Sequence, residues 1–314
     1  MIELKDCARL LKGAEKIEIF THTHPDGDAI GSAYALAAAL KKLGKTARVT
    51  INDTLPENFK YIYGAVKTEE FIPDFTVSVD LASMSLLGDF PEDKAFDLAI
   101  DHHLKNTVRT NALYCDPGAA ACGEIIFELI SLLGAELDLY LAQCLYTAIA
   151  TDTGCFKFSN TTSRTFSVAS KLCAYAPSGN FGYLNTPLFS TKSRKQIQLE
   201  CEVLSNLSYY FSSRVAIASL TFEMLERLSL TDNDTAGVEQ LAKLVEGVVI
   251  GITLKERDRG FKVSMRSDDS VDVSAICADF GGGGHHSAAG CFIEGSRDEV
   301  EKKLVEYFEG RDLL

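Results

Sequence analysis

The segment KIEIFTHTHPDGDAIGSAYALAAALKKLG, from Lys16 to Gly44, decides the fold. Its first part, Ile17–Thr21, is a short apolar run typical of a buried strand. The later part, Asp28–Leu43, is rich in alanine and leucine and is followed by Gly44, which together predict a helix. A buried strand followed at once by a helix is the repeating unit of a parallel, doubly wound sheet.

The same alternation continues through the first half of the chain. Further strands are predicted at 47–51, 76–80 and 97–101, and further helices at 122–133, from Asp138 to about 151, and at 162–175. The fold class predicted from this order is α/β, with an N-terminal, doubly wound and mostly parallel sheet.

The second half predicts a smaller α/β domain on a mixed sheet. Residues 191–213 have a helical period with no glycine or proline, so we expect a helical connector there, between domains at 1–190 and 214–314. The second domain should contain strands at 215–222, 248–254 and 261–266, the last two forming a hairpin, and helices at 234–246 and 271–280. A capping box of Ser296 and Glu299 opens a final helix.

Ionisable residues follow three of the predicted strands and one helix. They are His22, Asp26, Asp28, Asp80, Asp101, His102, His103 and Asp152. The carboxyl ends of parallel strands line the crevice where such sheets bind ligands. Carboxylates and imidazoles without sulfur favour Mn²⁺, with Mg²⁺ or Co²⁺ as substitutes. The alternative for the first group is a polar loop whose aspartate caps the helix, and spacing alone does not choose between His22 and His24 as a ligand.

Taken together, these residues predict a site for two metal ions. Two divalent ions about 3.5–4 Å apart hold a bridging hydroxide and clamp both the attacking and the leaving oxygen of a phosphoryl transfer. Such a site needs one carboxylate that bridges the ions, with histidine or carboxylate ligands on either side. The chain supplies these residues, which indicates hydrolysis of a phosphoester with the bridging hydroxide as nucleophile.

The stretch GGGGHHSAAG, residues 281–290, predicts a second functional element. Glycines allow close backbone approach, and their N–H groups can cradle an anion. The alternative is that these residues form only a tight turn between a helix and a strand, without binding a ligand. Arg266 ends a predicted strand and is our preferred phosphate ligand, whereas Arg257 and Arg259 have the pattern of solvated hairpin residues. The expected substrate-binding residues are Arg266, Gly282, Gly283, Gly284, His285 and His286.

Composition limits the classes of partner. The 314 residues carry a net charge of −13, which argues against a broad grip on long duplex nucleic acid. A small anionic ligand remains compatible, because bound cations invert the local charge. The nine cysteines are odd in number and form no CxxC pair, which favours reduced thiols in a cytoplasmic protein. No run of 18 apolar residues is present, so we expect no membrane partner.

The motifs resemble those of the DHH phosphoesterase superfamily. HPDGDAIGS, VSVD, IDHH and TDTG match its four N-terminal motifs in order, and GGGGHHSAAG is similar to the motif of its DHHA1 domain. The resemblance spans nearly the whole chain and is strongest to the bacterial nanoRNase and pAp phosphatase group. LPENFKYI, KFSNTT and KVSMRS resemble further signatures of that group.

The resemblance implies a role for each site residue. One Mn²⁺ would be held by His22, Asp26 and Asp80, and the other by Asp28, Asp80, His102 and Asp152, with Asp80 as the bridge and His22 favoured over His24. The expected catalytic residues are His103 and Asp101, with His103 contacting the scissile phosphate and assisting the leaving group. Arg266 and the patch around His285 would hold the terminal phosphate or nucleotide. The family often has one histidine in the glycine motif, so the role of His286 stays open.

We therefore expect a Mn²⁺-dependent hydrolase of phosphoric esters, a phosphodiesterase or exoribonuclease and 3′-phosphatase, with its active site in the cleft between two domains. Its expected substrates are short oligonucleotides, 3′-phosphoadenosine 5′-phosphate (pAp), or linear or cyclic dinucleotides. One alternative is an inorganic pyrophosphatase or polyphosphatase, against which the glycine motif argues. The other is a catalytically silent nucleotide-binding regulator. Whether the chain forms a homodimer stays open.

Overall fold

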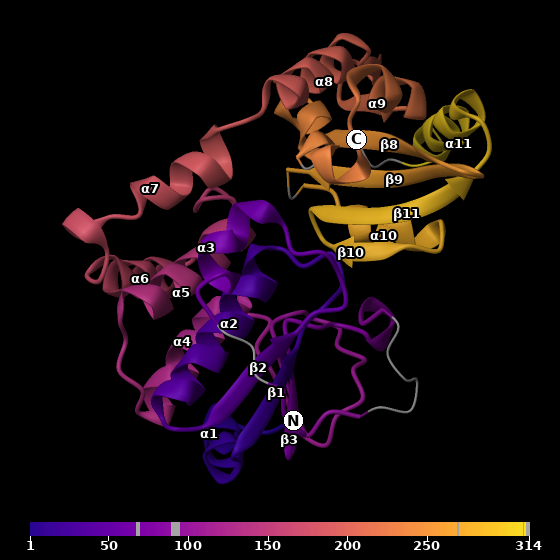
Figure 1. Cartoon of the computed structure of the whole chain (residues 1–314). Coiled ribbons are helices and arrows are strands. Elements are labelled where there is room, and N and C mark those ends of the chain that lie inside the picture. Colours follow the sequence, from indigo (N-terminus) through magenta and orange to yellow (C-terminus); the bar gives the residue numbers. More distant parts are fainter. Residues whose placement is uncertain (67–69, 89–94, 236, 269, 310, 312–314) are drawn as a thin grey trace. The chain divides into compact units, whose positions relative to one another are not determined.

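The computed structural model divides the chain into two compact units, residues 1–191 and residues 192–314 (Figure 1). The structure describes residues 1–66, 70–88, 95–235, 237–268, 270–309 and 311. Each unit has its own sheet and its own buried core. Among the described residues, no helix is both long and apolar enough to cross a membrane.

The first unit contains a five-stranded parallel sheet. The strands are β1 (Lys16–Phe20), β2 (Thr46–Thr50), β3 (Phe75–Val79), β4 (Leu98–Asp101) and β5 (Leu113–Cys115). Their order is β2-β1-β3-β4-β5 and every neighbouring pair is parallel. The chain runs from β1 to one side and then returns to the other, so the sheet has a topological switch point between β1 and β3. Ligands of open α/β sheets bind at the carboxyl ends of such strands.

One helix of the first unit precedes these strands, and the others lie between or after them. They are α1 (Leu4–Gly13), α2 (Gly27–Lys42), α3 (Lys60–Tyr63), α4 (Cys122–Leu133), α5 (Leu139–Asp152), α6 (Ser163–Cys173) and α7 (Gly182–Asn185). Short 3₁₀ turns at Glu57–Phe59, Met84–Leu86 and Pro177–Gly179 and a π-helical turn at Thr186–Ser190 complete it. The predicted α/β architecture of this half is confirmed, although α1 and β5 were not predicted.

Close packing of α2 against α5 brings two helix ends together. A Cβ atom built on Gly31 would lie 2.4 Å from the carbonyl oxygen of Cys144, and one built on Gly27 would lie 2.4 Å from Cγ2 of Thr151. Both distances are far below van der Waals contact, so only glycine permits this approach. As a result, the start of α2 lies against the end of α5, where Asp152 is the last residue.

The second unit is built on a six-stranded mixed sheet. Its strands are β6 (Ser208–Tyr210), β7 (Val215–Leu220), β8 (Ile250–Arg257), β9 (Gly260–Ser267), β10 (Gly283–His285) and β11 (Ala288–Glu294). The order is β10-β11-β9-β8-β7-β6, with β7 and β8 parallel and the other pairs antiparallel. The mixed sheet and the β8–β9 hairpin agree with the prediction.

The segment predicted as a helical connector contains α8 (Arg194–Ser205), and its Leu199 and Val203 are buried in a core shared with β7. One prediction for the second half needs correction. The expected helix at 234–246 is instead two 3₁₀ segments, Asp232–Thr235 and Val238–Leu244, with Ala236 outside the described residues. Gly237 has a φ of +86°, a left-handed conformation that interrupts a helix.

Three more helices complete the second unit. They are α9 (Phe222–Leu228), α10 (Val273–Asp279) and α11 (Arg297–Glu309). Residues of α10 and α11 pack in one core with the inward face of β8, β9 and β11. The opposite face of β7 packs in a separate core with α8 and α9.

Candidate metal centre

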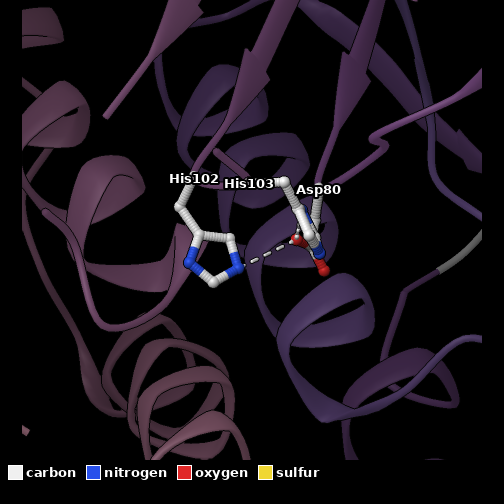
Figure 2. A group of neighbouring side chains, drawn as sticks. All are labelled: Asp80, His102 and His103. Carbon is white, nitrogen blue, oxygen red and sulfur yellow. Dashed lines mark ion pairs between the residues drawn. The ribbon is translucent and has the colours of Figure 1, made fainter. Parts of the chain in front are cut away.

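The residues predicted as metal ligands meet at the carboxyl ends of β1, β3 and β4. His22 follows β1, Asp80 directly follows β3, and His102 directly follows β4. Among the described residues, three groups of three have ligand atoms within 4.8 Å of one another. Two of them together contain all six predicted metal ligands: His22, Asp26 and Asp80 in one, and Asp28, His102 and Asp152 in the other. The third group is Asp80, His102 and His103 (Figure 2).

Both imidazoles of these groups are oriented by backbone carbonyls. Nδ1 of His22 donates to the carbonyl oxygen of Thr23 at 2.8 Å, and Nδ1 of His102 donates to that of Ala119 at 3.2 Å. Because a carbonyl can only accept, Nδ1 carries the proton in each neutral ring and Nε2 keeps a free lone pair. A hydrogen bond of this kind commonly fixes the tautomer of a metal-binding histidine.

The free nitrogens face carboxylates at distances that suit shared ligands. Nε2 of His102 is 3.4 Å from Asp152, 3.5 Å from Asp80 and 3.8 Å from Asp28. Nε2 of His22 is 3.8 Å from Asp80 and 3.9 Å from Asp26. These gaps exceed a good hydrogen bond. They match the spacing of about 3–4 Å between atoms that each lie about 2.1 Å from one ion.

Asp80 is the most strained residue of the cluster. It has a φ of +55°, a conformation that residues other than glycine rarely adopt. Its side chain is buried, and within the described chain its Oδ1 has no hydrogen-bond partner. Figure 2 shows the imidazole of His102 turned toward this carboxylate. Burial raises the pKa of Asp80 well above its ordinary value, and the nearby carboxylates of Asp28 and Asp26 raise it further.

The carboxylate of Asp28, in α2, is held by backbone groups at the start of α4. Its carboxylate accepts hydrogen bonds from the backbone N–H groups of Cys122 at 2.6 Å and Gly123 at 2.9 Å, and from the hydroxyl of Ser32 at 2.8 Å. Burial nevertheless raises the pKa of Asp28 to about 6. The helix N-terminus thus orients this carboxylate, while burial and the neighbouring acids still oppose its charge.

The remaining two carboxylates sit at helix ends. Asp26 precedes α2, and its Oδ1 accepts from the N–H of Ala29 at 3.0 Å, so the capping role weighed from the sequence is present together with its place in the cluster. Burial raises the pKa of Asp152, as do the charges of Asp28 and Asp26. Acids that raise one another's pKa in this way form a cluster whose ionised state a bound cation would stabilise.

His24 faces away from the cluster. Its Nδ1 lies 2.9 Å from Oδ2 of Asp53, and its backbone N–H donates to the same oxygen at 2.8 Å. The ring is largely exposed. The structure therefore brings His22, and not His24, to the predicted metal ligands.

His103 and Asp101, the residues predicted as catalytic, form a hydrogen-bonded pair. Nδ1 of His103 donates to Oδ1 of Asp101 at 2.8 Å. Asp101 is fully buried and also accepts from the backbone N–H of His102 and from the side-chain amide of Asn106. Burial opposes the charge of each member, but their mutual contact outweighs it, so the pKa of Asp101 is lowered and that of His103 raised. Asp101 thus orients His103, and Asn106 is a supporting residue that no sequence motif indicated.

The predicted substrate residues of the second unit occupy one edge of its sheet. Arg266 of β9 lies opposite Ala288 of β11, which lies opposite His285 of β10. Residues directly opposite one another project from the same face of a sheet, so Arg266 and His285 flank the small side chain of Ala288. The guanidinium of Arg266 is half-buried and donates to the carbonyl of Met265. Burial lowers its pKa, against a smaller opposing effect of the Glu239 carboxylate.

The first glycines of the motif form a tight turn between α10 and β10, in which the N–H of Gly282 bonds to the carbonyl of Cys277, and the rest of the motif forms the edge hairpin of β10 and β11. A Cβ on Gly282 would lie 2.1 Å from the carbonyl oxygen of Gly290, and Gly284 has a φ of +151°. These two glycines are required by the hairpin itself, whereas Gly283 has open space around it. His286 lies in the hairpin turn, with Nδ1 3.7 Å from Asp272.

Two family models match the chain. The model of the N-terminal domain of the DHH family matches residues 16–149, within the first unit. The model of the DHHA1 domain matches residues 219–310, within the second unit. The metal cluster and the glycine hairpin each lie largely within one of these matches, and Asp152 follows the end of the first.

Two similar proteins have names that state an activity. The chain is 34% identical to the bifunctional oligoribonuclease and PAP phosphatase NrnA of Thermus thermophilus, over 95% of this chain and 91% of that protein. It is 26% identical to the protein of the same name from Bacillus subtilis, over 93% of each. Both likenesses extend across the two units.

A solved structure has the same fold throughout. An exopolyphosphatase-related protein from Bacteroides fragilis superposes with a TM-score of 0.88, covering 98% of this chain and 95% of that chain, at 24% identity. At this level of identity the likeness supports the fold of both units and carries no statement about substrate.

Proposed function

The chain belongs to the DHH family of phosphoesterases and carries a C-terminal DHHA1 domain, and from this we propose that it uses two divalent metal ions to hydrolyse short oligonucleotides and pAp. It is thus a hydrolase of phosphoric ester bonds. The substrate class is supported by the two relatives whose names state it, one of them 34% identical over nearly the whole chain.

The observation that carries the metal proposal is the buried carboxylate of Asp80, whose Oδ1 accepts no hydrogen bond from the described residues. A buried carboxylate beside other carboxylates is strongly unfavourable unless a cation neutralises it. Asp80 belongs to the His22 group and also faces His102 of the other group. This shared position supports a bridging role between two ions.

The donor set fits Mn²⁺ or Mg²⁺. All six proposed ligands offer a carboxylate oxygen or an imidazole nitrogen, and none offers sulfur. Four carboxylates also balance the charge of two divalent ions. We propose Mn²⁺ as the metal, because two imidazoles favour a borderline ion over Mg²⁺.

When bound, the ions would polarise the phosphoryl oxygens and activate water for attack. The residues of the chain prepare the rest of the site. Nδ1 of His103 donates its proton to Asp101, and Nε2 would donate to a phosphoryl or leaving oxygen of the substrate. The contact with Asp101 raises the pKa of His103, against the opposing effect of burial. In the second unit, Arg266 and His285 would bind a phosphate or nucleotide through charge-assisted hydrogen bonds.

The proposal is tested with a substrate panel on the full-length protein. Metal-stripped protein should be inactive, and added Mn²⁺ should restore release of phosphate from pAp and of mononucleotides from a pentanucleotide RNA. A linear dinucleotide, cyclic di-AMP and pyrophosphate complete the panel, with Asp80→Asn as the inactive control. Fastest turnover of pyrophosphate would assign the protein to a different reaction. Tight nucleotide binding without turnover of any substrate would make it a nucleotide-binding regulator.

A further inference from the structure

Asn160 joins two segments that carry predicted metal ligands. It lies in the loop between α5 and α6, and its side-chain amide donates to the carbonyl oxygen of Ala120 at 3.0 Å and to that of Asp152 at 3.1 Å. Both partners are carbonyl oxygens, so the amide nitrogen, and not its oxygen, must face them. The carbonyl of Asp152 is one of those at the end of α5 that have no partner within the helix.

The other carbonyl belongs to a short backbone segment, residues 119–123, at the start of α4. This segment contacts the Asp28, His102 and Asp152 group without contributing a side chain. The carbonyl of Ala119 accepts from Nδ1 of His102, and the N–H groups of Cys122 and Gly123 donate to Asp28. The side-chain amide of Asn160 links the carbonyl of Ala120 to the carbonyl of Asp152, the third member of that group.

We propose that Asn160 is a positioning residue that holds this ligand group at the spacing a metal ion needs. Its carboxamide fixes the end of α5 relative to residues 119–123, and so fixes the 3.4 Å gap between Asp152 and Nε2 of His102. The inference rests on the proposed metal site and adds a residue outside the ligand set. A shift of a few tenths of an ångström in one ligand is enough to weaken an ion that needs all of its ligands at once.

The local turn does not itself need this side chain. The N–H of Thr161 bonds to the carbonyl of Phe158, and the hydroxyl of Thr162 caps α6, so the loop and the next helix have their own backbone and capping contacts. The side chain of Asn160 is therefore available to act on the two distant carbonyls. Its loss should leave the fold in place and loosen the metal site.

The experiment compares Asn160→Ala and Asn160→Asp with the wild type, and uses Ser159→Ala, an exposed neighbour, as the matched control. Mn²⁺ affinity is measured by titration calorimetry on the full chain without substrate, and the unfolding temperature is measured on metal-free protein. In Asn160→Ala, one of the two ions should bind about 10-fold more weakly, because outer-shell contacts typically contribute 10-fold or more to affinity. The metal-free unfolding temperature should change little, and Ser159→Ala should match the wild type in both measurements.

Asn160→Asp distinguishes a donor from a space-filling residue. Aspartate has the size of asparagine, but its ionised side chain has no donor and would repel both carbonyl oxygens. It should therefore bind Mn²⁺ no better than Asn160→Ala. Wild-type affinity in Asn160→Asp would overturn the inference, as would unchanged affinity in Asn160→Ala accompanied only by a raised KM, which would indicate substrate contact. A wild-type protein that binds no divalent ion would overturn the proposed function and this inference together.

Discussion

The first unit buries several ionisable residues of its candidate site, whereas the second exposes the histidines of its glycine motif. Asp28, Asp80 and Asp101 have 2% or less of their surface accessible, and burial raises the pKa of Asp28 and Asp80. In the second unit, His285 and His286 are exposed, and the glycines beside them are part of the edge hairpin of β10 and β11. The first region holds carboxylates that repel one another. The second presents exposed side chains on a hairpin whose two strands are already hydrogen-bonded to each other.

This difference separates two tasks. A site that binds metal ions tightly gains from ligands that are unfavourable without them, because the ion then relieves repulsion that the fold has built in. A surface that recognises a substrate must stay accessible and must not collapse before the ligand arrives. The strain in this protein is therefore expected to lie in the first unit, and the specificity in the second.

The largest expected effect tests the chemistry of the first unit. His103→Ala should lower kcat on the order of 10²-fold or more, because the side chain is proposed as the proton donor. Its metal content, measured by elemental analysis after reconstitution with Mn²⁺, should stay at that of the wild type. The control is His24→Ala, whose ring pairs with Asp53 outside the cluster and whose loss should change neither quantity appreciably. If His103→Ala loses an ion, the roles proposed for His102 and His103 are wrong.

A smaller effect is expected when the guanidinium of Arg266 is removed from the second unit. Arg266→Ala should reduce kcat/KM for pAp and short RNA by about 10–100-fold, since a charge-assisted contact contributes about 1.5–3 kcal/mol. A small artificial phosphodiester should be affected far less. Arg257→Ala is the matched control, because Arg257 binds Asp232 through both of its terminal nitrogens. Equal losses on both substrate types would mean that Arg266 supports the fold and that selection lies elsewhere.

The glycine motif allows a third test, with an effect on stability. Gly282→Ala should destabilise the protein by about 1–3 kcal/mol, because its Cβ would clash with the carbonyl of Gly290. Gly283→Ala meets open space and should cost less than about 0.5 kcal/mol. Chemical denaturation measures both. If Gly283→Ala weakens nucleotide binding at unchanged stability, the motif also serves the ligand, and if the two variants are equally stable, the hairpin does not depend on Gly282.

The sequence was most informative where ionisable residues follow the apolar runs that predict buried strands. Short apolar runs that end in Asp80 or in Asp101-His102-His103 predicted both the strands and the cluster, because ionisable residues at the end of a buried strand need a partner. The capping of α5 by Asp138 was also predicted, because a helix cap is a local hydrogen bond that depends only on residues close in sequence.

What the sequence could not predict depends on contacts between distant residues. Spacing did not separate His22 from His24, because the choice follows from Asp53, which lies 29 residues after His24. The contact of Asn160 with Ala120 spans 40 residues and involves an exposed side chain with no periodic signal. The strand β5 escaped prediction because its three residues are only half-buried. The helix predicted at 234–246 is interrupted at Gly237, which has a left-handed φ of +86°.

The central claim is that the first unit is strained until metal ions bind, and unfolding of Asp80→Asn with and without Mn²⁺ tests it most directly. Without metal, the variant should be more stable than the wild type by about 1 kcal/mol or more, because it removes a carboxyl group whose ionisation is opposed by burial and by the neighbouring carboxylates. With Mn²⁺ at about 100 times its dissociation constant, the wild type should gain about 2.7 kcal/mol per ion and become the more stable of the two. A reversal of the stability order on adding Mn²⁺ is the predicted result. A wild type that is the more stable protein in both conditions, or a variant that gains as much from Mn²⁺ as the wild type, would contradict the account.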